Sequence, residues 1–408
     1  MKSFWQAIVR FFQRPRNAFW FGFVIACAAT GIEVARDRGE NFYDFFYSTC
    51  LFWGNADAAH AYPDAVQLIL QGITPYMQPF RDLAHVNRFF LYSPVFSFLF
   101  TPFIWLPYKV AAFAWNLMNY SLFFLAIMKL PKKLGAPSVK VFLYMLLLLE
   151  ASIFPFQYNI VVSYIFLFAY KFLEEDKPAW AVLLIMLSAT TKLYGAIELI
   201  MLLCYRRPLR NFGLALLFGV MFLLLPIIHL GTEGFVPYYQ SWLAAIGLHN
   251  ATEMYYSLIY IKPFTEWTME YRKVLQIGSA ALLTLLFFLY HRRWSDFRFR
   301  TRVIAVLMGW ICLFSDATEP HTYIIACSGY MLFYYSQQQH NRLDEVLYWV
   351  NWVLFGIFPI DILCPPVVYD LMHHTLWLDI WLFFFTWLYM IRVTLTDRTE
   401  ESVPVNAH

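Results

Sequence analysis

Apolar segments that approach the thickness of a lipid bilayer recur along nearly the whole chain, and short polar or basic segments separate them. A membrane-spanning helix needs about 20 apolar residues to cross about 30 Å of hydrocarbon. Because 60% of the 408 residues are hydrophobic and only 14% are charged, the chain has too few polar side chains to surround a water-soluble core. The pattern predicts a single all-α, polytopic integral-membrane domain over residues 1–408 and excludes a soluble globular protein.

We count about twelve apolar runs of this kind and accept shorter ones where neighbouring helices could bury them. The runs cover residues 18–35, 110–130, 141–156, 159–173, 178–191, 193–205, 211–230, 274–290, 303–314, 322–336, 346–362 and 376–393. The first run follows a basic segment but is not followed by a small-residue cleavage site, so we expect a retained span rather than a signal peptide. The expected fold is a bundle of about twelve transmembrane helices.

The distribution of lysine and arginine predicts the orientation of the chain. Basic residues concentrate in segments 129–133, 206–210, 292–302 and 392–398. Because short cytoplasmic loops carry an excess of lysine and arginine, we expect these segments and both termini, including a tail over residues 394–408, to be cytoplasmic. This requires that segment 93–107 does not cross the membrane. The segment is short and contains three prolines, so we expect a re-entrant or interfacial helix there.

The opposite, extracytoplasmic side then holds most of the polar residues outside the basic loops. It includes a first loop over residues 36–109, in which we expect interfacial or re-entrant helices, and a long loop over residues 231–273. The first loop carries Asp57, a possible general base, followed by turn-forming residues that include Gly72 and Pro75. This loop is the best candidate for the seat of function.

Lys192 stands between two apolar runs that are too short for a comfortable crossing. Runs 178–191 and 193–205 extend about 20 Å each at about 1.5 Å per residue, so the chain should turn near Lys192 at membrane depth. A cation at that depth normally faces an anion or a wet cavity. The alternative is a structural lysine that is paired or extends its ammonium group to the interface.

Several residues occur in an order that resembles a known family. They are Asp57, Tyr62, Leu70-Gln71-Gly72, Pro75-Tyr76, Phe90-Leu91-Tyr92-Ser93-Pro94, Trp115, Asn119, Gln157-Tyr158-Asn159, Thr191-Lys192 and Glu319-Pro320-His321. The order resembles the bacterial membrane glycosyltransferases of GT-C type that use polyprenyl-phosphate mannose, glycosyltransferase family 87. The resemblance implies a GT-C-like fold in the cell (inner) membrane and an extracytoplasmic active site. It assigns Asp57 as the catalytic base and Lys192 and His321 to the donor phosphate. The candidate substrate-binding residues are Tyr62, Tyr76, Tyr92, Asn119 and Asn159.

The same residue types suit the expected chemistry. Moving a hexose, mannose by resemblance, from a polyprenyl-phosphate sugar to a hydroxyl of a lipid-linked or glycan acceptor needs a base at the acceptor and cations at the departing phosphate. Direct displacement would invert the anomeric centre. The phosphodiester becomes a monoester and gains charge, which Lys192 and His321 would stabilise in the transition state.

Other classes of function find less support in the sequence. No glycine-rich strand-to-helix turn predicts a nucleotide-sugar site, and the six scattered cysteines lack the spacing of a zinc site, so we expect no metal and no cofactor. The basic residues lie in short loops, which predicts contact with membrane lipids and no nucleic-acid partner. A transporter or lipid flippase is the main alternative, because broken helices and an intramembrane lysine also occur there. A non-catalytic scaffold subunit is a further alternative.

Overall fold

The computed structural model describes residues 6, 10–36, 40–55, 80–81, 87–88, 90–249, 256–261, 267, 270–315, 318–360 and 363–397. Within these residues the regular structure is helical, apart from two short strands, β1 (Phe80–Arg81) and β2 (Asn87–Arg88), which pair antiparallel. Three predicted site residues, Asp57, Tyr62 and Tyr76, lie outside the described part of the chain.

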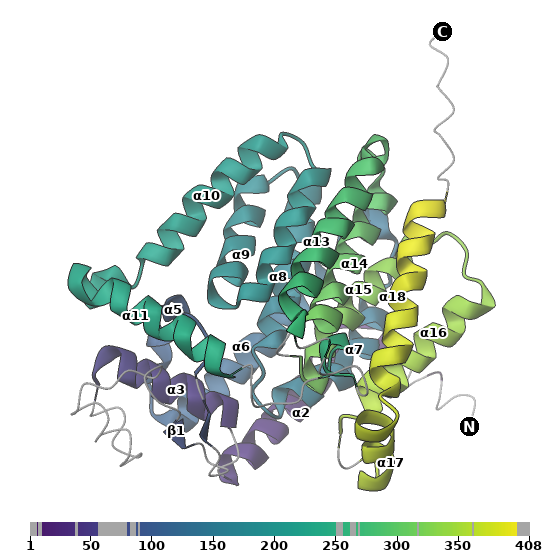
Figure 1. Cartoon of the computed structure of the whole chain (residues 1–408). Coiled ribbons are helices and arrows are strands. Elements are labelled where there is room, and N and C mark those ends of the chain that lie inside the picture. Colours follow the sequence, from purple (N-terminus) through teal and green to yellow (C-terminus); the bar gives the residue numbers. More distant parts are fainter. Residues whose placement is uncertain are drawn as a thin grey trace.

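Helices cover nearly all of the described chain (Figure 1). The α-helices are α2 (Pro15–Ala35), α3 (Glu40–Trp53), α5 (Pro94–Ile104), α6 (Tyr108–Met128), α7 (Ser138–Ile153), α8 (Asn159–Glu174), α9 (Pro178–Thr191), α10 (Pro208–Leu224), α11 (Ile227–His249), α13 (Arg272–Leu289), α14 (Phe297–Phe314), α15 (Tyr323–Ser336), α16 (Arg342–Trp352), α17 (Pro366–Asp370) and α18 (Leu378–Thr396). Shorter helical segments are η1 (Lys132–Leu134), η2 (Leu193–Cys204), η3 (Leu258–Tyr260), η4 (His291–Arg293), η5 (Pro320–Thr322), η6 (Val353–Ile357) and η7 (Leu371–Thr375). Every predicted apolar run overlaps a helix, so the all-helical prediction is confirmed.

By length and composition, four described helices could cross a membrane: α2, α6, α13 and α18. The number rises to five if α10 and α11 count as one bent span. Helices α5 and α9 and the segment η2 are apolar but shorter. The chain is therefore a polytopic membrane protein, and the count of about twelve spans stays a prediction.

The apolar run predicted over residues 211–230 is not one straight helix, and this corrects the sequence analysis. The axes of α10 and α11 meet at 89° across the break after Leu224. Pro226 lies in this break, where it cannot donate a backbone hydrogen bond to continue α10. Gly231 then adopts φ 65°, a left-handed conformation that glycine tolerates without a side-chain clash. The segment predicted as a loop from residue 231 is helical as far as His249.

The core forms where helices approach each other closely. Helices α8, α13, α14, α15 and α18 run side by side in Figure 1. Nearly all residues of α14 and α15 are buried. At Gly329 of α15 an added Cβ would meet the Ala305 carbonyl oxygen and the Met308 Cβ at 2.8 Å each, so a small residue is needed for this helix contact.

Helices α3, α5 and α11 gather at one end of the molecule (Figure 1). The 11 residues of α5 extend only about 16 Å, which is too short for a full crossing and fits the predicted re-entrant or interfacial helix. From α11, the His229 Nε2 lies 2.8 Å from the Phe52 carbonyl oxygen, and the Trp242 Nε1 donates to the Leu91 carbonyl oxygen at 2.9 Å. Helix α11 therefore joins α3 to the segment that leads into α5.

Candidate active site

Lys192 lies at the predicted turn between α9 and η2. Helix α9 starts at Pro178, whose missing N–H is unneeded in a first turn, and ends at Thr191. Lys192 itself is extended, with φ −139° and ψ 112°. Three residues on, a Cβ at Gly195 would overlap the Ser188 side chain and lie 2.8 Å from the Ser188 backbone carbon. Glycine at this position lets η2 pack against the last turn of α9, and the turn predicted here is confirmed.

The ammonium group of Lys192 is held by neutral partners. Its Nζ donates to the Asn159 Oδ1 at 3.3 Å and lies 5.1 Å from the ring centre of Tyr92 and 4.9 Å from that of Tyr194. The Tyr194 hydroxyl donates to the same Oδ1. Rings at this range attract a cation without neutralising its charge. Three predicted site residues, Lys192, Asn159 and Tyr92, are thus brought together.

A hydrogen-bond network connects Asn159 to a distant part of the chain. The Asn159 Nδ2 donates to the Gln157 Oε1 at 2.8 Å and to the Thr322 Oγ1 at 3.1 Å. The Gln157 Nε2 then donates to the Glu319 Oε2 at 2.6 Å. The Glu319 carboxylate also attracts the Lys192 ammonium group electrostatically. The network therefore joins the start of α8 to the segment around η5.

His321 belongs to η5 and lies between Glu319 and Thr322. The carbonyl oxygen of His321 accepts a hydrogen bond from the Ser152 Oγ at 3.4 Å, and the Thr322 Oγ1 accepts one from the Glu319 backbone N–H at 3.0 Å. Glu319 and Thr322, the residues on either side of the Pro320–His321 pair, are bonded to Gln157 and Asn159 and so belong to the hydrogen-bond network around Lys192. This places the His321 backbone at the same end of α8 as Lys192.

The segment that contains Tyr92 is fixed against the end of α9. The Ser93 Oγ donates to the Thr190 carbonyl oxygen at 2.5 Å, and the Ser93 N–H donates to the Thr191 carbonyl oxygen at 3.3 Å. Burial raises the pKa of Tyr92 well above its ordinary value, and the nearby carboxylates of Glu319 and Asp44 raise it further. Tyr92 therefore stays protonated and can donate a hydrogen bond.

Sequence reasoning did not give roles to several members of this cluster. Glu319 and Gln157 are parts of the motifs that contain His321 and Asn159, but the sequence assigns no role to them or to Tyr194. The signal available was spacing, since each of the two polar residues precedes a predicted site residue by two positions. Asp44 of α3 acts on Tyr92, although it could only be counted as one of several acids in the first loop.

Asn119 occupies a different setting from Lys192. Its side chain is fully buried in α6, and the Tyr164 hydroxyl of α8 donates to its Oδ1 at 3.2 Å. This contact packs one helix against another, and a substrate contact by Asn119 stays a prediction.

Among the residues that the structure describes, no three His, Cys, Asp or Glu side chains are grouped as metal ligands. The His373 Nδ1 lies 2.9 Å from the Asp379 Oδ2.

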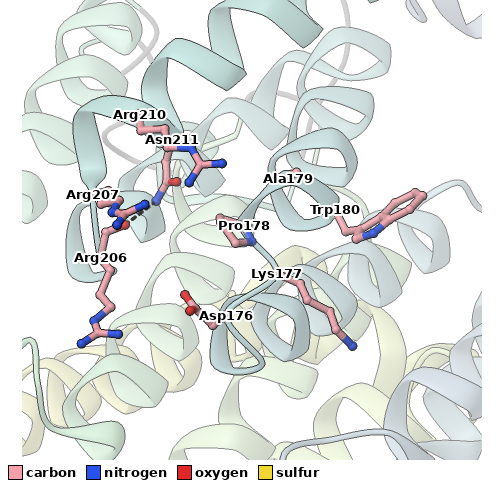
Figure 2. Close-up of a pocket in the computed structure, with 9 residues that line it drawn as sticks. All are labelled: Asp176, Lys177, Pro178, Ala179, Trp180, Arg206, Arg207, Arg210 and Asn211. Atoms are coloured by element: carbon pink, nitrogen blue, oxygen red, sulfur yellow. Dashed lines mark hydrogen bonds between the residues drawn. The ribbon is translucent and has the colours of Figure 1, made fainter.

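A second polar cluster lies at the other end of α8. Segments 176–180 and 206–211 face each other across a pocket of about 740 Å³ that three arginines line, Arg206, Arg207 and Arg210 (Figure 2). Glu174, the last residue of α8, lines an adjoining pocket with Arg206. Helix α8 has 16 residues, so about 24 Å separates its two ends. The basic cluster is therefore distinct from the Lys192 cluster.

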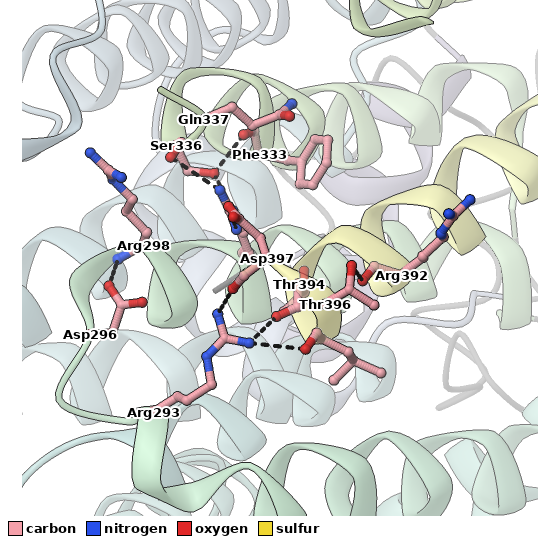
Figure 3. Close-up of polar contacts among 12 residues, drawn as sticks. Arg293, Asp296, Arg298, Phe333, Ser336, Gln337, Arg392, Thr394, Thr396 and Asp397 are labelled. Atoms are coloured by element: carbon pink, nitrogen blue, oxygen red, sulfur yellow. Dashed lines mark hydrogen bonds and ion pairs between the residues drawn. The ribbon is translucent and has the colours of Figure 1, made fainter. Parts of the chain in front are cut away.

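The C-terminal end of α18 is held by the basic segment before and within α14 (Figure 3). The Arg293 Nη1 donates to the carbonyl oxygens of Thr394 and Leu395 at 2.9 and 3.1 Å, which satisfies the end of the helix. The buried Arg302 forms an ion pair with Asp397 at 2.7 Å. Two segments predicted to be cytoplasmic thus meet, although the side of the membrane stays a prediction.

Comparison with known families gives one match. The model of glycosyltransferase family 87 matches residues 90–315, more than half of the chain. The matched region contains Tyr92, Asn159 and Lys192 and ends shortly before Glu319. No curated protein matches the sequence. The family resemblance drawn from the order of residues is confirmed.

Proposed function

Because the chain belongs to glycosyltransferase family 87 and is therefore a membrane glycosyltransferase, we propose that it moves mannose from a polyprenyl-phosphate donor to a hydroxyl group. The acceptor is a lipid-linked or glycan molecule, transfer takes place on the extracytoplasmic side, and the fold is of GT-C type. The observation that carries the proposal is the environment of Lys192. Its ammonium group has amide and aromatic partners and makes no ion pair with any described carboxylate.

An anionic donor suits this environment. The ammonium group of Lys192 is partly shielded from water and makes no direct ion pair with a described carboxylate, so it attracts a phosphate more strongly than an exposed lysine does. Asn159 orients the Nζ, and Gln157 connects Asn159 to Glu319. The fixed geometry reduces the reorganisation needed when charge develops on the phosphate.

In the proposed reaction the acceptor oxygen forms a bond to the anomeric carbon as the bond from that carbon to the phosphate oxygen breaks. Asp57 takes the acceptor proton late, when the attacking oxygen has become acidic, so an ordinary carboxylate suffices. The departing polyprenyl phosphate gains negative charge, which Lys192 and His321 stabilise through charge-assisted hydrogen bonds. A single displacement inverts the anomeric configuration. Tyr62, Tyr76 and the Tyr92 hydroxyl contact the substrates.

The test uses the purified full-length protein in lipid nanodiscs. Polyprenyl-phosphate mannose, polyprenyl-phosphate glucose and GDP-mannose are each supplied with a panel of membrane glycolipids, and labelled product is measured. We expect transfer from polyprenyl-phosphate mannose alone and a loss of about 10²- to 10⁴-fold in Asp57→Asn, the range for removal of a general base. Use of GDP-mannose, or equal turnover by Asp57→Asn, would reject the donor or the base respectively. Movement of the labelled lipid across the bilayer without product would favour the transporter alternative.

A further inference from the structure

The pocket at the basic end of α8 has no part in the proposed transfer reaction. It lies between the start of α9 and the start of α10 and has a volume of about 740 Å³ (Figure 2). An adjoining cavity of about 590 Å³ shares several of its lining residues. A hollow of this size at the surface can admit a polar group larger than water.

The charges in the pocket are mostly uncompensated. Arg206, Arg207 and Arg210 are exposed and form no ion pair with a carboxylate in the described part of the chain. Asp176 is the one carboxylate that lines this pocket, whereas Lys177 is neutralised by Glu175 at 2.9 Å. Arginine presents several N–H donors in a planar fork that matches a phosphate group. The pocket therefore favours a phosphate-bearing anion.

The local backbone adds further donors. Arg207 adopts φ 56° and is the cap residue of α10, so the unpaired N–H groups of the first turn begin beside the arginines. Asn211 lines the pocket with only 1% of its surface exposed; its Nδ2 donates to the Arg206 carbonyl oxygen at 3.1 Å, but its Oδ1 accepts no hydrogen bond. A buried acceptor without a partner indicates a missing donor. A ligand with a phosphate and a hydroxyl group would satisfy both features.

Apolar surface continues from the pocket along α10. Leu209 is 87% exposed, and further apolar residues on the same helix are also exposed. These are Leu216, Leu217, Val220, Met221, Leu223 and Leu224. Trp180 lines the pocket and is 59% exposed, a position typical of tryptophan at a membrane interface. A free phosphate ion would make no use of this surface, whereas the acyl chains of a lipid would cover it.

We propose that this pocket binds the headgroup of an anionic glycerophospholipid of the phosphatidylglycerol class. The arginines hold the phosphate, a headgroup hydroxyl donates to the Asn211 Oδ1, and the acyl chains lie along α10. The lipid comes from the leaflet at the Arg206 end of α8, about 24 Å from the Lys192 cluster by the length of α8. The site is separate from that of the sugar donor and does not depend on the proposed reaction.

The test measures lipid binding by the delipidated full-length protein in detergent, using native mass spectrometry and titration with short-chain phosphatidylglycerol, phosphatidylcholine or inorganic phosphate. The triple variant R206Q/R207Q/R210Q removes the pocket charges. The matched control K129Q/K132Q/K140Q removes three exposed charges between the end of α6 and the start of α7 and leaves the pocket intact. Thermal unfolding without lipid checks that both variants fold.

We expect the wild type to bind phosphatidylglycerol in preference to phosphatidylcholine. Loss of charged hydrogen bonds to phosphate should weaken binding about 10- to 100-fold in the arginine triple and leave the lysine triple unchanged. Equal weakening in both triples would show a general charge effect and reject the site. Inorganic phosphate binding as tightly as the lipid would show a small-anion site and reject the lipid. An unfolded arginine triple would shift the test to Asn211→Asp, in which an added carboxylate must also weaken lipid binding.

Discussion

The two ends of α8 both carry cations, but the surroundings of those cations differ. At one end Lys192 lies among an amide and two aromatic rings, and a hydrogen-bond network fixes its position. At the other end Arg300 pairs with Glu174 at 2.8 Å and Arg302 pairs with Asp397. Three further arginines at this end, Arg206, Arg207 and Arg210, line an open pocket. The number of charges is greater at the second end. A preorganised cation, rather than a high density of charge, distinguishes the candidate active site.

Of the changes that test this comparison, removal of the Lys192 charge should have the largest effect on transfer activity. We expect Lys192→Met to lower kcat/KM for the polyprenyl-phosphate donor about 10²- to 10³-fold, the usual loss for one transition-state donor. Lys192→Arg should recover part of the activity. The exposed Lys132→Met is the control and should transfer at the wild-type rate. Wild-type kinetics in Lys192→Met would assign Lys192 a structural role.

The close contact at Gly195 allows a test of the turn that presents Lys192. Gly195→Ala places a methyl group against the Ser188 backbone, so we expect a loss of about 1–3 kcal/mol in unfolding free energy together with lower transfer activity. The control is Gly213→Ala in α10, where nothing lies within 4 Å of an added Cβ. Thermal unfolding in detergent measures both. A Gly195→Ala protein as stable and active as the wild type would show that η2 can shift freely.

Breaking the hydrogen bond between Gln157 and Glu319 should have a smaller effect on transfer activity. Gln157→Leu removes a 2.6 Å hydrogen bond to a carboxylate and should lower kcat/KM about tenfold, because Asn159 loses its support. The matched control is Gln337→Leu, which removes a similar hydrogen bond, from the Gln337 amide to the Asp344 carboxylate, at the C-terminal end of α15. We expect no change in donor KM for the control. Equal losses in the two variants would indicate general destabilisation rather than a role in donor binding.

The smallest effect on catalysis should come from the arginine pocket. The substitutions R206Q/R207Q/R210Q alter exposed residues far from Lys192, so transfer in detergent should stay within about twofold of the wild type. Detergent assays of the donor KM measure this. A large loss of transfer in this variant would mean that the two ends of α8 are functionally coupled, and would contradict the separation of the arginine pocket from the active site.

The sequence predicted those features that depend on local pattern. The length of the apolar runs predicts the helices, and the two short runs on either side of Lys192 predict the turn there. The order of the motifs indicates the family. The 89° bend after α10 could not be predicted from apolarity, because the apolar run continues through it. The spacing to Asn159 and His321 could draw attention to Gln157 and Glu319. It could not show that the two residues contact each other, because they lie 162 positions apart. Asn119 could not be separated from Asn159, because both are buried and only their partners differ: Tyr164 beside Asn119, and Lys192 and Tyr194 beside Asn159.

The corner between α10 and α11 directs α11 toward the segment that contains Tyr92. One of its contacts is with its own predecessor, where the Tyr239 hydroxyl donates to the Leu223 carbonyl oxygen at 2.8 Å. Further along, Trp242 holds the Leu91 carbonyl oxygen, one residue before Tyr92. This contact fixes the chain that keeps the Tyr92 ring centre 5.1 Å from the Lys192 Nζ. The position of one aromatic ring at the candidate active site thus depends on the direction that α11 takes after the corner.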